Sequence, residues 1–353
     1  MIFRGISLVS HALQRRFNLT LSPRMLTYTV TFACNARCIM CDSWKMPPRE
    51  ELTLDDLERI FAQLPRLDIV RLTGGEPFVR RDLPGIADLA TRQLRPLVLH
   101  VTSNGLLTDR IVRFCESRRG QPRLHLLISV DGVGEKHNQI RGNRSAWPSV
   151  LETLQTIAPM QHRWNVRLAV NQTIVDAEGV QHYGLLRDVL KKLGVLHQVV
   201  LAYDTSAAYH VEADVDLAPR QAGQFTTFGE IDTRDLETWL DEADRDAGEL
   251  PFWERRAKRY YLRGIRNRLL HDRAAPNPAC AALNSHLRIF PNGDVPTCQF
   301  NSRIVGNLRE QPFTQLWRSE GIAEQRRWVR RCPGCWAECE VLPNAVYSLD
   351  LLP

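Results

Sequence analysis

The chain has 353 residues, which at roughly 100–200 residues per domain is enough for two or three domains. Its content of 44% hydrophobic and 24% charged residues is ordinary for a globular protein, excludes collagen and gives no reason to expect wholesale disorder. The net charge of +6 weakly favours anionic small molecules or a membrane surface, and it falls well short of the charge of a typical nucleic-acid-binding protein.

The N-terminal segment carries apolar side chains at helical spacing between Ile2 and Phe17, with basic and polar residues elsewhere on the helical wheel. We therefore predict an amphipathic helix within residues 1–24, either packed on the main domain or lying at a membrane surface. No secretory signal peptide is evident, and no uncharged apolar run approaches the roughly 18 residues of a membrane span. We expect a cytoplasmic protein, with peripheral membrane contact as an alternative.

Residues 25–205 alternate between strand and helix patterns. The predicted strands are 26–32, 68–73, 97–102, 124–130, 166–170 and 197–202, and the predicted helices are 54–64 (capped by Thr53), 86–94, 111–118, 150–158 and 183–193. This alternation indicates parallel βαβ units. The predicted fold class is therefore α/β, a partial (β/α)6 TIM-like barrel whose active site lies at the carboxyl ends of the strands.

The pattern changes after the barrel. Residues 206–279 are first acidic and then basic, and we predict a helical linker there with helices at 233–247 and 252–271. Charge runs of this kind are usually solvated helix faces. Pro276 and Pro278 then separate the linker from residues 280–353, which we predict to be a small cysteine-rich C-terminal domain.

Eight of the nine cysteines lie in two groups near opposite ends of the chain, which favours metal binding in a reducing compartment over disulfides. The ninth, Cys115, lies in a helical pattern and is predicted to be a plain core residue. In the first group, Cys34, Cys38 and Cys41 follow a predicted strand. Three thiolates without a fourth nearby can hold a metal centre that keeps one position open, as reactive centres do.

This CxxxCxxC motif after the first strand of a βα barrel resembles that of the radical S-adenosylmethionine (SAM) enzymes. The resemblance implies that Cys34, Cys38 and Cys41 bind a [4Fe–4S] cluster whose remaining iron chelates SAM. It also implies that Gly74, Gly75 and Glu76, after the second strand, hold the methionyl amine of SAM. Met40 stands where the family often has an aromatic residue near the adenine.

Two further matches are softer. By resemblance, Ser129 after the fourth strand and Arg141 beyond it would contact the SAM ribose and carboxylate, and Ser103 and Asn104 would form a polar turn near SAM. Ordinary turn chemistry explains each of these pairs as an alternative.

The second cysteine group contains Cys280, Cys298, Cys332, Cys335 and Cys339. The Pro-Asn-Gly-Asp stretch at 291–294 predicts a hairpin turn that brings Cys280 and Cys298 together. The pattern resembles the auxiliary-cluster extensions of radical SAM enzymes called SPASM and twitch. With five cysteines instead of seven, it implies one auxiliary [4Fe–4S] cluster held by Cys280, Cys298, Cys332 and Cys335, with Cys339 as the competing fourth ligand. A zinc site remains the alternative.

The resemblance implies an enzyme that reductively cleaves SAM to a 5′-deoxyadenosyl radical, which abstracts hydrogen from an unactivated carbon of a small-molecule, peptide or lipid substrate. It also implies a reducing partner such as flavodoxin or ferredoxin, and an auxiliary cluster that transfers electrons or binds substrate. No nucleic-acid partner is expected. The alternative is a non-catalytic iron–sulfur or zinc-binding protein, which would not cleave SAM. The sequence does not identify a catalytic acid or base.

Overall fold

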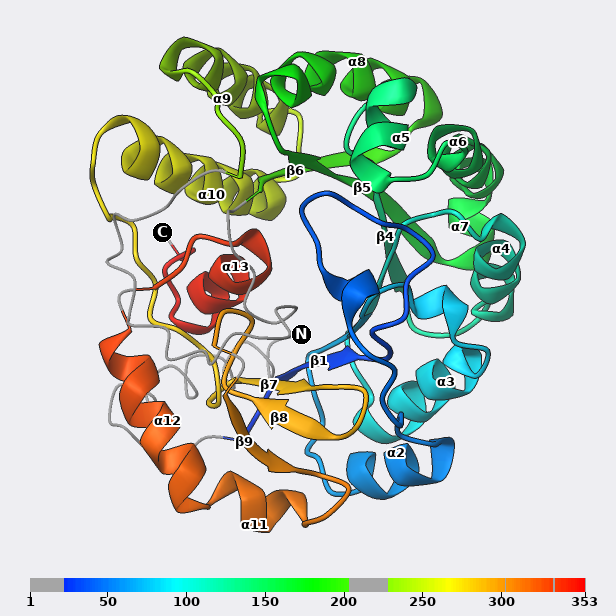
Figure 1. Ribbon diagram of the computed structural model, residues 1–353, viewed down its shortest axis with the longest axis vertical. Coiled ribbons are helices and arrows are strands. Elements are labelled where there is room, and N and C mark those ends of the chain that lie inside the picture. Colours follow the sequence, from blue (N-terminus) through cyan, green and yellow to red (C-terminus); the bar gives the residue numbers. More distant parts are fainter. Residues whose placement is uncertain (1–21, 203–227, 302, 333, 353) are drawn as a thin grey trace.

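The computed structural model describes residues 22–202, 228–301, 303–332 and 334–352. The helix predicted between Ile2 and Phe17, and the start of the predicted linker, lie outside the described residues. Figure 1 shows the described chain as a curved sheet with helices around its outer side and the C-terminal region beside its open edge.

The main sheet has seven parallel strands in the order β6-β5-β4-β3-β2-β1-β7. The strands are β1 Met25–Thr29, β2 Ile69–Thr73, β3 Val98–Ser103, β4 Leu124–Ser129, β5 Val166–Ile174, β6 Leu196–Leu201 and β7 His286–Ile289. The first six are the six predicted strands, and the partial barrel with a cysteine-rich C-terminal region is confirmed. Since all strands are parallel, their carboxyl ends form a single rim.

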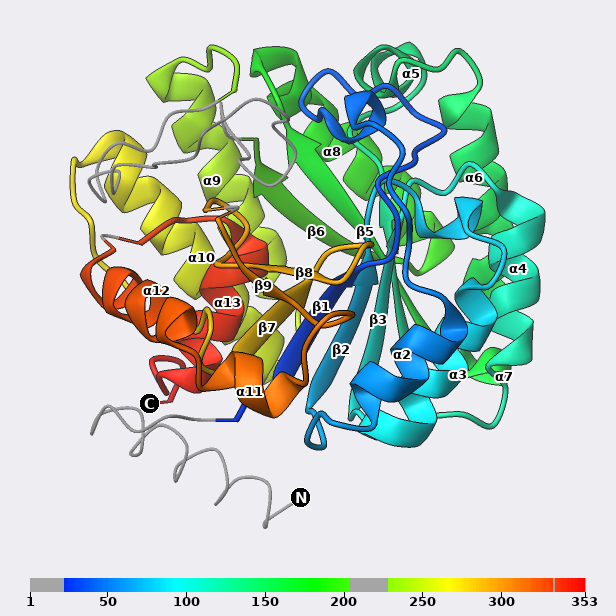
Figure 2. The ribbon, with the colours of Figure 1, turned by 60° about the horizontal axis from the view of Figure 1, so that its bottom comes forward.

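Helices between the strands cover the outer side of the sheet (Figures 1 and 2). They are α2 Leu54–Phe61, α3 Leu83–Leu94, α4 Thr108–Ser117, α5 Glu135–Arg141, α6 Ala146–Ile157, α7 Gln161–Trp164 and α8 Ala177–Leu193. Helix α2 begins with a capping box, in which Thr53 and Asp56 satisfy each other's backbone N–H groups. Cys115 is fully buried in α4 within the apolar core, as predicted for a core residue.

Along β2, β3 and β4, successive side chains alternate between the two faces of the sheet. In β2, β3 and β4, buried positions pack against the helices, and every intervening position keeps partial exposure on the inner side. The buried side chains that face the helices include Val70, Leu72, Val101 and Leu126, all in the main apolar core. These intervening side chains line the interior of the barrel.

The C-terminal region adds its own strand to this sheet. Strand β7 pairs in parallel with β1, so the six predicted strands become seven. The turn predicted at 291–294 is present, because the Gly293 N–H donates to the Phe290 carbonyl (3.0 Å) and Gly293 has a φ of +95°. The strand that follows, β8 Asp294–Pro296, pairs with β9 Ile304–Asn307 in a separate antiparallel ribbon.

Five further helices follow the six-stranded part of the barrel. They are α9 Thr233–Ala247, α10 Phe252–Leu270, α11 Phe313–Trp317, α12 Glu320–Arg331 and α13 Glu338–Tyr347. The first two match the helices predicted for the linker. A second apolar core joins α9, α10 and α13 to β6 and the end of β5, and thereby covers the open side between β6 and β7 (Figure 1). No described helix is long and apolar enough to cross a membrane.

Trp336 packs the C-terminal region against α10. Its ring stacks on Tyr261 at an interplanar angle of 3° and on Tyr260 at 27°, and its indole N–H donates to the Tyr261 carbonyl (2.9 Å). The ring lies directly over Gly264, where an added Cβ would come within 1.8 Å of it. Only glycine at 264 therefore allows this contact without displacing Trp336.

Gly264→Ala is expected to lower the free energy of unfolding by about 1–3 kcal/mol, because the new methyl group overpacks the Trp336 ring. Urea unfolding followed by fluorescence measures the change. Gly184→Ala in α8 is the matched control, since an added Cβ there would meet only the end of the flexible Arg187 side chain, at 3.6 Å, and it should not destabilise the protein. Equal stability of the two variants would contradict the proposed packing.

Candidate functional site

The loop of Cys34, Cys38 and Cys41 begins at the carboxyl end of β1 and is fixed there by the turn after β2. The N–H of Gly75 donates to the Thr31 carbonyl (2.8 Å), and the N–H of Glu76 donates to the Ala33 carbonyl (2.9 Å). A Cβ at position 75 would lie 2.4 Å from the carbonyl oxygens of both Phe32 and Ala33. Glycine is therefore required for the two segments to approach this closely.

Helix α5 holds the same loop from the other side. The N–H groups of Arg37 and Ile39 donate to the carbonyls of Arg141 (2.9 Å) and Ile140 (3.0 Å). Gly142 ends the helix with a φ of +59°, and a Cβ there would lie 2.5 Å from the Arg37 carbonyl oxygen. Sequence reasoning missed this seven-residue helix, although the glycine that follows it is a helix-termination signal.

The three thiols lie close enough together to influence one another. Burial, reinforced by the neighbouring Cys38 and Cys41, raises the pKa of Cys34 to about 11, and burial also raises the pKa of Cys41. The Ala36 N–H donates to the Cys34 sulfur (3.4 Å). Because metals bind thiolates, loading of this loop with iron would release protons.

Arg141 is placed against the cysteine loop. Its Nε forms an ion pair with Asp131 Oδ2 (2.7 Å), its Nη1 lies 3.6 Å from the Cys38 sulfur, and both side chains are buried. Asp131 in turn accepts from the N–H of Thr173 (3.0 Å). A fixed positive charge thus stands beside a thiol that sequence analysis assigned to the metal centre.

Glu76 is fully buried and accepts hydrogen bonds from three groups of the protein. The donors are the N–H of Phe78 (3.0 Å), the hydroxyl of Ser103 (2.9 Å) and the N–H of Asn104 (2.6 Å). Burial raises the pKa of Glu76 to about 7, although these hydrogen bonds oppose the shift. A carboxylate has about four acceptor positions, so one remains.

Ser103 and Asn104 therefore donate hydrogen bonds to the Glu76 carboxylate, a role that sequence reasoning did not foresee. The Asn104 side chain also donates to Asn35 Oδ1 (2.7 Å), which links the turn after β3 to the cysteine loop. Met40 packs against Ile140 in a small apolar cluster at the same rim. Ser129 ends β4 opposite Asn171 of β5 and is partly exposed.

The structure brings together Cys280, Cys298 and Cys335 of the second cysteine group. Burial raises the pKa of Cys298, and the neighbouring Cys280 raises it further. Burial likewise raises the pKa of Cys335, and both Cys280 and Cys298 add to that effect. The Asn301 N–H donates to the Cys298 sulfur (3.3 Å). Burial raises the pKa of Cys332, and burial together with the Glu340 carboxylate raises that of Cys339 to about 11, which the Arg71 charge opposes.

Within the described residues, no three cysteine, histidine or carboxylate side chains converge closely enough to hold one metal ion. Each cysteine of an iron–sulfur cluster binds a different iron, so cluster ligands need not converge in this way.

Comparisons with known proteins identify the family. The model of the radical SAM superfamily matches residues 28–170, and that of the SPASM iron–sulfur cluster-binding domain matches residues 280–339. The GTP 3′,8-cyclase of Aquifex aeolicus is 33% identical over 329 residues, which cover 87% of this chain and 93% of the cyclase. This chain belongs to the radical SAM superfamily. An AdoMet-dependent heme synthase of Methanosarcina barkeri is 25% identical over 339 residues, covering 91% of this chain and 90% of the synthase.

Solved structures support the fold of this radical SAM enzyme. SuiB of Streptococcus suis bound to S-adenosylmethionine has a TM-score of 0.61 at 15% identity, covering 90% of this chain and 70% of SuiB. A structure of anSMEcpe with bound AdoMet has a TM-score of 0.58 at 15% identity, covering 88% of this chain and 85% of anSMEcpe. The cofactors of the family are SAM and [4Fe–4S] clusters, and the residues here suit them. They supply two groups of thiols, sulfur-directed N–H donors and a glycine turn.

Gly75→Ala is expected to separate the cysteine loop from the turn after β2, because its methyl group would meet two carbonyl oxygens. Protein reconstituted with iron and sulfide should then lose the iron of one cluster, about four atoms per chain. Iron analysis with circular dichroism measures loading and folding together. Gly321→Ala in α12 is the control, since its nearest neighbour lies at 3.7 Å. Full iron loading of Gly75→Ala would show that the close approach is unnecessary.

Proposed function

We propose that this radical SAM enzyme cleaves SAM reductively and uses the resulting 5′-deoxyadenosyl radical to abstract hydrogen from a carbon of its substrate. The observation that carries the proposal is the cysteine loop, held between the turn after β2 and the end of α5 at the carboxyl rim of the barrel. When bound, a [4Fe–4S] cluster with an open coordination position supplies the single electron that this cleavage needs. A protein serving only to store or pass electrons would not need the glycine turn.

The residues take the following roles in this proposal. Cys34, Cys38 and Cys41 hold the SAM-binding cluster, and the partly exposed backbone of Gly74 and Gly75 faces the methionyl end of SAM. The fourth acceptor position of Glu76 is available to the SAM amine. Met40 and Ser129 line the adenosyl part, while the Arg141 guanidinium stays beside the Cys38 sulfur and attracts the SAM carboxylate.

The second cysteine group holds an auxiliary [4Fe–4S] cluster in this proposal. Cys280, Cys298 and Cys335 are its ligands, because they are the thiols that act on one another, and either Cys332 or Cys339 completes the set. The external electron source is a reduced carrier such as flavodoxin or ferredoxin. The domains are a barrel core at 25–205, a helical linker at 206–279 and an auxiliary-cluster domain at 280–353.

The inner face of the barrel supports an anionic substrate. Arg71 of β2 lies opposite Thr27 of β1 and His100 of β3 in the sheet register and points away from the outer helices. Its Nη1 donates to the Cys339 carbonyl (3.2 Å), whereas its buried Nε has no hydrogen-bond partner and no carboxylate forms an ion pair with it among the described residues. A substrate carboxylate or phosphate would form the ion pair and accept the remaining hydrogen bonds of this guanidinium.

Arg288 of β7, one strand beyond Thr27, shows the opposite arrangement. Its Nη2 bonds Glu340 Oε1 of α13 at 2.6 Å, and both side chains are at most 5% exposed. Burial by itself would raise the pKa of Glu340. The charges of His286 and Arg288 outweigh this effect and lower the pKa of Glu340 to about 2. Arg288 is therefore a structural cation, while Arg71 remains available to a ligand.

Several classes of anionic substrate would be able to pair with the Arg71 guanidinium. GTP, named in the cyclase, is an anion, and two structural neighbours at 14% identity are bound to peptides, which can carry carboxylates. We propose an anionic small molecule, peptide or lipid as the substrate class.

Anaerobically reconstituted protein is expected to release 5′-deoxyadenosine from SAM when dithionite is added. Replacing Cys34, Cys38 and Cys41 by serine should abolish this release and remove about four irons per chain. The same replacement of Cys280, Cys298 and Cys335 should leave SAM cleavage and remove the other irons. Cys115→Ala is the control and should change neither readout. A fully loaded protein that releases no 5′-deoxyadenosine would favour the non-catalytic alternative.

Arg71→Met is expected to leave the free energy of unfolding unchanged or raise it, since it removes a buried charge that forms no ion pair among the described residues. Arg288→Met should cost about 3–5 kcal/mol, because it leaves the buried carboxylate of Glu340 without its guanidinium partner and with His286 alone beside it. Urea unfolding of both variants without added polyanions makes the comparison. If Arg71→Met were as destabilising as Arg288→Met, Arg71 would be a structural cation and the argument for an anionic substrate would fail.

A further inference from the structure

The outer face of α10 forms a basic surface that the proposed chemistry does not use. Two adjoining hollows of about 560 and 430 Å3 lie along this helix and share Asp244, Arg259 and Arg263. Together they are lined by six arginines and three aspartates, so three positive charges are in excess. We call this surface the arginine groove; its charged residues are Asp241, Asp244, Arg245, Arg255, Arg256, Arg259, Arg263, Arg266 and Asp350.

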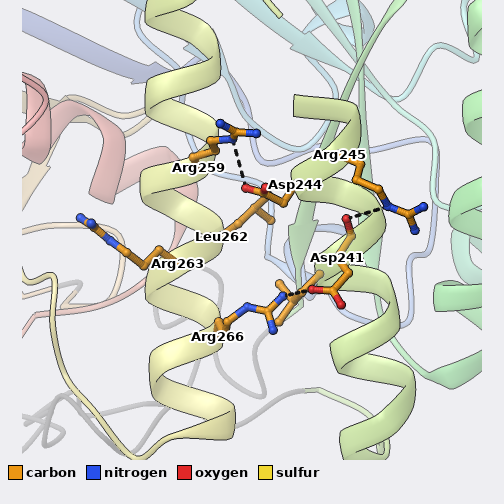
Figure 3. A pocket seen from close by; sticks show the side chains of 8 residues that line it. Asp241, Asp244, Arg245, Arg259, Leu262, Arg263 and Arg266 are labelled. Atoms are coloured by element: carbon orange, nitrogen blue, oxygen red, sulfur yellow. Dashed lines mark hydrogen bonds and ion pairs between the residues drawn. The ribbon is translucent and has the colours of Figure 1, made fainter. Parts of the chain in front are cut away.

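Several of these arginines are held in fixed positions. Figure 3 shows Arg259 and Arg266 of α10 reaching across to Asp244 and Asp241 of α9. Arg256 donates to the carbonyl of Leu352 (2.7 Å) near the C-terminus. Arg263 is exposed and points away from α9 (Figure 3), and among the described residues it forms no ion pair. A preorganised row of guanidinium groups is suited to carboxylates, because less side-chain entropy is lost when they bind.

An exposed aromatic pair stands at the start of the same helix. Phe252 and Trp253 are 54% and 57% exposed, and their rings meet edge to face at 5.0 Å. Phe252 also lines the second hollow. Aromatic residues and arginine are the types enriched at protein–protein interfaces, where aromatic anchors supply much of the binding energy.

The floor of the arginine groove leads to the second cysteine group. Tyr260 lines the second hollow, and its ring stacks on Trp336 with centroids 5.8 Å apart. Trp336 directly follows Cys335, one of the three thiols that act on one another. Two aromatic rings therefore separate the surface of α10 from a proposed cluster ligand.

We propose that the arginine groove docks a small acidic electron-carrier protein, which exchanges one electron with the iron–sulfur site at Cys335. This rests on the function proposed above, which requires an external one-electron source. In each exchange a reduced carrier is oxidised by one electron and the iron–sulfur site is reduced by one, with no bond made or broken. The hollow shape and the aspartate-fixed arginines favour a protein over a lipid surface, which would demand a flat or protruding face.

The test measures binding of purified flavodoxin and ferredoxin to the reconstituted enzyme by calorimetry, at several salt concentrations. The test variant is Arg259→Glu/Arg263→Glu. The control, Arg92→Glu/Arg113→Glu, makes the same change of net charge at exposed arginines of α3 and α4, on the other side of the barrel (Figure 1). We expect at least one carrier to bind with an affinity that falls with salt. The test variant should weaken it at least tenfold, and the control should change it by less than about twofold.

Stopped-flow reduction of the iron–sulfur absorbance provides a second readout. The test variant should be reduced more slowly by the bound carrier and at the normal rate by dithionite, which is too small to need the groove. Carrier binding that is equal in the test variant and the wild type would overturn the proposal, as would binding of phosphatidylglycerol vesicles with no binding of either carrier. Failure of dithionite-driven SAM cleavage in the wild type would instead reject the proposed function, while leaving the binding result readable.

Discussion

The structure depends on one close backbone contact, between the turn after β2 and the segment that leads into the cysteine loop. The N–H groups of Gly75 and Glu76 reach the carbonyls of Thr31 and Ala33, and this is possible only because position 75 has no side chain. The contact places the two motifs that the family uses for its cluster and for SAM against each other. Any change in the length of either loop would separate them.

A polar network at the rim extends this contact to neighbouring strands. The buried carboxylate of Glu76 joins the turns after β2 and β3, and Asn104 carries the connection on to Asn35 in the cysteine loop. On the other side, Asp131 after β4 fixes Arg141 beside Cys38. Hydrogen-bonded and ion-paired buried groups of this kind favour one arrangement, since each alternative leaves more of them without partners. The rim is therefore rigid enough to hold reactive chemistry.

The C-terminal region is integrated into the barrel. Strand β7 extends the main sheet, the Arg288–Glu340 pair ties α13 to that strand, and the Trp336 ring lies on Gly264 of α10. The second cysteine group is consequently fixed relative to the inner face of the barrel. Electron exchange and substrate binding could then take place on a single rigid framework, with Arg71 facing the interior and the arginine groove facing solvent.

The sequence alone determined the alternation of strands and helices, the cysteine spacing and the glycine turn, because these are local patterns of hydrophobicity and residue type. It did not reveal β7, which has only four residues, or α5, whose role lies in its contact with a distant loop. Tertiary structure decided that Ser103 and Asn104 bond Glu76, and that Cys335 lies near Cys280 and Cys298. It also decided that Arg288 forms an ion pair with Glu340, while Arg71 donates to the Cys339 carbonyl and forms no ion pair among the described residues. These outcomes depend on which residues distant in the chain become neighbours, and a single sequence carries no local signal for that.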